Sequence, residues 1–200
     1  MKNTKCLKDL LKQATFVTAI FATSFSLFTS CTNDRNTKDS KAIAEKQNDT
    51  NFDNKEKKND AQFLVNAAEI NLKEIFLGQL AQKKGKSSHI KELGRKMEEV
   101  HSQSQKELAS LAKSKSINIP TSPSDKTKDT YSKLNKESAD DFDKAYADKM
   151  VDGHKEAIDV YQSASKEVND PAIKKWAINS LPNLHNHLNH SIKCQRKCKS

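Results

Sequence analysis

Glycine is scarce in this chain of 200 residues, which holds only four glycines. A phosphate-binding loop needs several closely spaced glycines, so the sequence excludes the common nucleotide-binding loops. No serine stands in the glycine-flanked pattern of a hydrolase nucleophile, and no segment alternates apolar and polar residues as a strand does. The chain therefore shows no recognisable catalytic set, and we expect its regular structure to be helical.

Aromatic residues make up only 6% of the chain, and the positive charge is unevenly placed. The formal net charge falls from +9 to about +6 once residues 1–30 are left out. Four of the remaining charges lie at the C-terminus, on Lys193, Arg196, Lys197 and Lys199. Nucleic-acid binding needs a basic face with stacking aromatics, so we expect no nucleic-acid partner.

The N-terminus carries the pattern of a bacterial lipoprotein signal peptide. Four lysines within the first twelve residues precede a charge-free stretch from Ala14 to Phe28, which is followed by Thr29, Ser30 and Cys31. Small residues directly before a cysteine allow a lipoprotein signal peptidase to cut there. We therefore expect residues 1–30 to be removed and Cys31 to be lipidated. The mature protein would then be attached to a membrane of the bacterial envelope, most simply the outer membrane, facing the periplasm.

Residues 31–60 are rich in Asn, Asp, Lys and Thr and hold only scattered apolar side chains. Such a composition cannot bury a core, so we expect a disordered tether that begins at the lipidated Cys31. At the other end of the chain, Cys194 and Cys198 are spaced one helical turn apart. The sequence leaves open whether they form a local disulfide, an intermolecular bridge or free thiols.

Helical periodicity begins at Ala61, and residues 61–194 are long enough for one core. We predict an all-α, up-and-down four-helix bundle with a short extra helix in the long middle connection and a basic tail at residues 195–200. The caps, prolines and periodicity place the helices at Ala61–Lys84, Ser88–Ser116, Asp125–Lys136, Ser138–Val168 and from Pro171 onward.

Four ionisable residues fall within the apolar stripes of the four long helices: Glu74, His101, His154 and His187. Glu98 is a further candidate because it stands three residues before His101 on the same helix. Imidazole and carboxylate groups are ligands that suit zinc or iron, so these five residues are candidate metal ligands.

A buried polar layer without metal is the alternative. In that case Glu74 would accept a hydrogen bond from His101 or pair with a lysine. A six-ligand di-iron centre is not expected, since Val151 and Leu184 stand where such a site would place glutamates. The sequence leaves the two interpretations open.

Several motifs resemble the bacterial family called domain of unknown function 4142, often labelled predicted outer-membrane proteins. They are Phe63-Leu64 with Ala67-Ala68, Glu74-Ile75 with Gly78-Gln79-Leu80-Ala81, Met97 with His101, Phe142-Asp143 with Tyr146 and Met150-Val151 before His154, and Leu181-Pro182 with Leu184, His187 and Leu188. The resemblance implies a ferritin-like bundle in the envelope, with no established activity. It also implies that Glu74 and the three histidines recur. The aspartate that often precedes the histidine is replaced here by Val100 and Gly153.

The sequence thus favours a lipid-anchored envelope protein with a binding or structural role over an enzyme. The alternative function is that of a ferritin-like protein that binds iron or zinc at an interior Glu/His site. A protein partner cannot be named from the residues.

Overall fold

A computed structural model describes residues 39–199, and every regular element in this range is a helix. The predicted all-α fold is confirmed. Among these helices, none has an apolar stretch sufficient to cross a lipid bilayer. The predicted signal peptide and Cys31 lie outside the described residues. The six helices are α1 (Ser40–Asn51), α2 (Lys55–Lys84), α3 (Ser88–Ser114), α4 (Asp125–Lys136), α5 (Ala139–Glu167) and α6 (Pro171–Lys197).

Polar caps set where the later helices begin. The Ser138 hydroxyl accepts a hydrogen bond from the Asp141 amide and donates one to the Asp141 carboxylate, so the predicted serine cap starts α5, with Asp141 bonded to the hydroxyl of Ser138 rather than to its amide. Asp170 caps α6, where Pro171 occupies the first turn. The short helix α4 has the predicted bounds. Helix α6 runs through Pro182 and continues to Lys197, so residues 195–197 of the segment predicted as a basic tail are helical.

The sequence predicts a disordered tether over residues 31–60, but the described part of this segment, residues 39–60, is largely helical. This segment contains α1 and the start of α2, and Ala44 of α1 is buried. Asn48 is buried too, and its side chain donates to the Asn118 carbonyl and accepts from the Asn118 amide, both at 2.8 Å. A few specific contacts with the rest of the fold thus order a segment whose composition alone predicts disorder.

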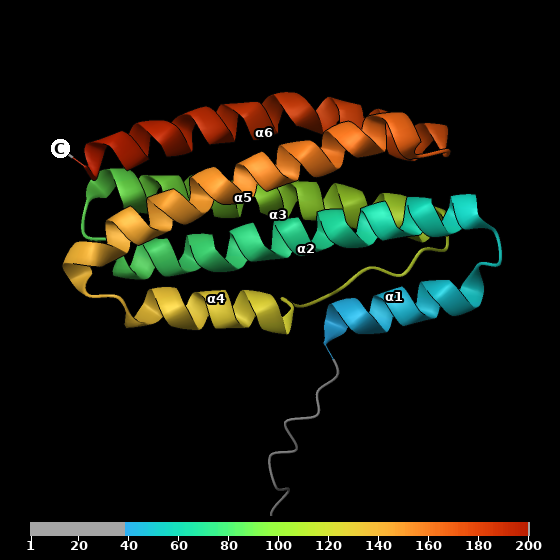
Figure 1. The fold of residues 1–200 in the computed structure, drawn as a ribbon, viewed down its shortest axis with the longest axis horizontal. Helices are drawn as coiled ribbons and strands as arrows, with labels where there is room; N and C mark the ends of the chain where they lie inside the picture. Colours follow the sequence, from blue (N-terminus) through green and yellow to red (C-terminus); the bar gives the residue numbers. More distant parts are fainter. Residues whose placement is uncertain (1–38, 200) are drawn as a thin grey trace, which may run out of the picture. The chain divides into compact units, whose positions relative to one another are not determined.

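The four long helices lie side by side, and α1 and α4 run along α2 (Figure 1). Short loops join α2 to α3 and α5 to α6, and each of these two pairs makes extensive contact. Helices α2 and α3 are in close backbone contact at two glycines, Gly78 and Gly94. A Cβ atom at Gly78 would lie 2.6 Å from the Gly94 carbonyl oxygen, and the reverse distance is the same. Only glycine allows this backbone contact.

Two aspartates connect the helix pairs at opposite ends. Asp143 of α5 accepts hydrogen bonds from the amides of Lys86 and Ser87 in the α2–α3 loop, at 2.9 and 2.8 Å. Asp60 of α2 accepts from the amides of Asn169 and Asp170 in the α5–α6 loop, at 2.8 and 3.0 Å. These contacts fix how far one pair is shifted along the other, and so they align the middles of the four helices.

A polar layer separates two apolar clusters inside the four long helices. One cluster contains Leu64, Leu108 and Tyr161, and the other contains Leu77, Met97 and Met150. Between them along each helix lie buried polar residues, namely Asn71 and Glu74 on α2, His101 on α3, His154 on α5, and His187 and Ser191 on α6. This polar layer holds the candidate site.

Candidate metal centre

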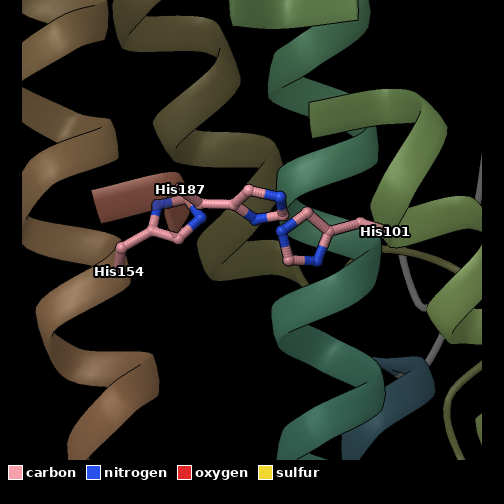
Figure 2. Close-up of side chains that lie close together, drawn as sticks. All are labelled: His101, His154 and His187. Atoms are coloured by element: carbon pink, nitrogen blue, oxygen red, sulfur yellow. The ribbon is translucent and has the colours of Figure 1, made fainter. Parts of the chain in front are cut away.

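Three helices direct one histidine each into the polar layer. His101 comes from α3, His154 from α5 and His187 from α6, and their rings turn toward one another (Figure 2). The ring centroids lie 5.3 to 5.8 Å apart, and each side chain is at most 3% exposed. One ring nitrogen of each histidine lies within 4.8 Å of those of the other two. The structure thus brings together three of the five predicted ligands.

Hydrogen bonds orient two of these imidazoles. His154 Nδ1 lies 2.8 Å from the Met150 carbonyl oxygen, which only accepts, so Nδ1 carries the proton. His101 Nδ1 lies 2.9 Å from Asn71 Oδ1, while the Asn71 amide group donates to Gln105. The Nδ1 atom of His101 is therefore also the donor. In both rings Nε2 is left with a lone pair, which is the form that binds a metal.

One nitrogen of each ring has no hydrogen-bond partner among the described residues. His101 Nε2, His154 Nε2 and His187 Nδ1 are all buried and unpaired. Buried polar atoms in folded proteins are nearly always satisfied, so three orphaned nitrogens facing one space require an explanation. A cation between the three histidines would pair all of them at once.

Burial keeps two of the histidines neutral. It lowers the pKa of His187 to about 3, with a further contribution from His154. Burial also lowers the pKa of His101 well below its usual value, and the neighbouring His154 and His187 act in the same direction. Neutral imidazole is the metal-binding form, so these two rings are ready to bind without first losing a proton.

Glu74 lies in the same polar layer but does not join the histidine cluster. It is 1% exposed, and neither carboxylate oxygen has a hydrogen-bond partner among the described residues. Lys73 Nζ approaches Oε1 at 4.0 Å. A Cβ atom at Gly153 would lie 3.2 Å from the same oxygen, which places the carboxylate against the backbone of α5 beside His154.

The Tyr146 hydroxyl is a further buried, unpaired group near Glu74. Burial raises the pKa of Tyr146 well above its usual value, and the negative charge of Glu74 adds to this shift. Of the two partners expected for Glu74 in a metal-free layer, His101 donates to Asn71 instead, whereas a lysine, Lys73, does pair with the Glu74 carboxylate at 4.0 Å.

Glu98 is not brought to the histidines. Its carboxylate accepts hydrogen bonds from Gln79 and Gln82 of α2, at 2.8 and 2.6 Å. These bonds lower the pKa of Glu98 and fix it in the contact between α2 and α3. Residues three apart point about 60° away from each other around a helix, so Glu98 can lie at the edge of the shared face, in the α2–α3 contact, while His101 points into the polar layer.

Sequence reasoning missed Asn71, which orients His101. The interior position of Asn71 could be recognised from the sequence, because Asn71 stands three residues before Glu74 and so lies on the same face of α2. The two cysteines left open by the sequence are free thiols, with Cys194 buried and Cys198 partly exposed.

The profile of a protein family described as domain of unknown function, DUF4142, matches residues 44–193. The chain belongs to this family. The DUF4142 match begins inside α1 and extends nearly to the end of α6, so it includes Glu74 and all three histidines. It also includes most of α1, which agrees with the ordered structure of that helix. No curated protein and no solved structure matches the chain.

Proposed function

We propose that this DUF4142 protein binds one transition-metal ion, iron or zinc, between His101, His154 and His187. Two observations support the proposal: one ring nitrogen of each histidine lies within 4.8 Å of those of the other two, and each ring carries a buried nitrogen without a partner among the described residues. A purely structural polar layer would satisfy its own hydrogen bonds, whereas this one leaves its acceptors unpaired. Three imidazole ligands suit zinc and iron, and also cobalt as a spectroscopic substitute.

Glu74 supplies the counter-charge. Three neutral imidazoles around a divalent cation leave two positive charges in the interior, where uncompensated charge is costly. The buried acids Asp60 and Asp143 already bind backbone amides, whereas Glu74 accepts no hydrogen bond from the described residues. Its carboxylate is therefore the group in the polar layer that gains most from a nearby cation.

We base the proposed fold type and cellular location of this protein on its helix arrangement and its N-terminal sequence. The arrangement of α2, α3, α5 and α6 supports a ferritin-like four-helix bundle, with α4 in the middle connection and α1 as an addition. The lipoprotein pattern before Cys31 supports a lipid anchor in the bacterial envelope, with the helical domain facing the periplasm. We propose that the protein retains a metal ion there.

Metal content tests the function. The purified protein is incubated with zinc or ferrous iron, desalted and analysed by elemental mass spectrometry. We expect about one ion per chain, since one three-histidine cluster is present among the described residues. The variant His154→Ala removes a ligand and is expected to lose the ion.

His185→Ala is the matched control, because His185 lies on α6 near His187 but is exposed. This variant should retain the ion, and circular dichroism should show that both variants are folded. Absence of metal from the wild type after both incubations would contradict the proposal. Retention of metal by His154→Ala would contradict it as well.

A further inference from the structure

A pocket of about 410 Å³ lies between α3 and α6 and reaches the histidine cluster. His101 and His187 are part of its lining, together with Asn71, whereas His154 is not. Two of the three proposed ligand residues thus form part of the wall of a space that opens toward the surface, while their unpaired nitrogens are buried behind it. A larger pocket of about 530 Å³, lined by residues of α1, α2, α4 and α5, has no histidine in its lining. The histidine cluster is therefore approached from the α3–α6 side.

The cluster provides three protein ligands within the described residues. A structural zinc site normally has four protein ligands, whereas a site with three leaves a coordination position for water or another molecule. The pocket volume falls within the range of small-molecule sites. An ion bound by the three histidines would therefore have both a free position and a space beside it.

The pocket lining indicates which molecules fit. Its polar side chains are mainly uncharged, namely Asn71, Gln103, Ser104, Asn179, Ser180 and Asn183. The lining also holds two acids, Glu99 and Glu107, and no lysine or arginine. Amide and hydroxyl groups bind neutral polar molecules, and the two carboxylates disfavour anions that lack a counter-charge.

We propose that the α3–α6 pocket is the open side of the metal centre, where a small neutral molecule binds the ion through a lone-pair donor atom. This inference rests on the proposed metal-binding function. The donor atom completes the coordination that the three histidines leave unfilled, and the amide and hydroxyl groups hold the rest of the molecule. No covalent bond is made or broken in the protein.

Cobalt and imidazole test the proposal. The full protein is loaded with Co²⁺, whose visible spectrum responds to a change of ligand, and is titrated with imidazole at pH 8, where this probe is neutral. We expect imidazole to shift the spectrum of the wild type while one cobalt stays bound per chain. Elemental analysis after the titration checks the cobalt content.

Two variants block the pocket from opposite walls. Ser104→Trp fills it from α3, and Asn183→Trp fills it from α6, where Asn183 is exposed and tolerates a large side chain. Both should hold cobalt and lose the imidazole-induced shift. Ser163→Trp is the matched control, because Ser163 lines a different pocket next to Phe63 and Val168. This control should behave as the wild type does.

The outcomes separate the two proposals. A wild type that binds cobalt but shows no imidazole shift would overturn the open site alone. A full shift in both pocket variants would overturn it as well. A wild type that binds neither cobalt, zinc nor iron would overturn the metal-binding function, and the open site with it.

Discussion

The metal-free protein should lose stability in mild acid because of its histidine cluster. The pKa of His187 is about 3 in the folded protein, against an ordinary value of 6.5. Between these two values the unfolded chain binds a proton at this position and the folded protein does not. The stabilising contribution is therefore fully present above pH 6.5 and is lost progressively as the pH falls toward 3.

The size of the effect follows from the difference in pKa. At pH 5 the unfolded His187 lies 1.5 pH units below its pKa of 6.5, while the folded group is still neutral. Each unit corresponds to about 1.4 kcal/mol. Protonation of this one histidine in the unfolded chain therefore lowers the free energy of unfolding by about 2 kcal/mol at pH 5 relative to pH 7.5. His101, whose pKa is also lowered by burial, adds to the loss in the wild type.

Urea unfolding at pH 7.5 and pH 5, with a chelator present, measures this contribution. Carboxylates titrate in the same range, so the informative quantity is the change in stability between the two pH values, compared between wild type and His187→Gln. The variant lacks the titrating group, and its loss of stability on acidification should be smaller by about 2 kcal/mol. The exposed His185→Gln should retain the wild-type pH dependence. An equal loss in wild type and His187→Gln would refute the reasoning.

Three further substitutions test the packing that positions the site. Asn48→Ala removes both hydrogen bonds to the Asn118 backbone. It should lower the free energy of unfolding by about 1–3 kcal/mol and speed amide hydrogen exchange in α1. Unchanged exchange would show that these bonds do not hold α1 in place. Gly78→Ala places a Cβ atom 2.6 Å from the Gly94 carbonyl oxygen and should lower the free energy of unfolding, measured in urea, by about 1–3 kcal/mol. An unchanged value would mean that α2 and α3 can move apart at no cost to accommodate the methyl group. Asp60→Ala leaves two amides of the α5–α6 loop unpaired and should lower the melting temperature, while an unchanged value would show that water replaces the carboxylate.

The three histidines could be found from the sequence because helical phase accumulates predictably along a helix. His101, His154 and His187 each lie within an apolar stripe that spans several turns, so the interior direction is fixed by many residues at once. The structure places Glu98 in the contact between α2 and α3 instead, because its spacing from His101 fits that position as well. A spacing of three residues along one helix therefore does not tell whether a side chain lies in the polar layer or in the contact with the neighbouring helix.

The first helix could not be predicted in this way. Its sequence has few apolar residues, and its order depends on Asn48 reaching Asn118, which lies 70 residues further along the chain. No local pattern indicates such a contact. Asn71 is an intermediate case, because its place on the buried face of α2 was visible but its partner His101 was not. Long-range pairing of polar side chains is the part of this fold that only the structure provides.

The distribution of unsatisfied groups argues that the polar layer exists for a ligand. Six buried side-chain atoms lack a hydrogen-bond partner among the described residues, and they belong to Glu74, Tyr146 and the three histidines. Leaving each such atom unpaired costs about 1–3 kcal/mol, and apolar residues of similar size would remove that cost. A layer kept only for packing would have no reason to retain it. One nitrogen of each histidine ring lies within 4.8 Å of those of the other two, Glu74 lies in the same layer, and His101 and His187 line a pocket. The cation that we propose would pair the ring nitrogens and balance the charge of the carboxylate from a distance, and so it would offset the cost of this arrangement.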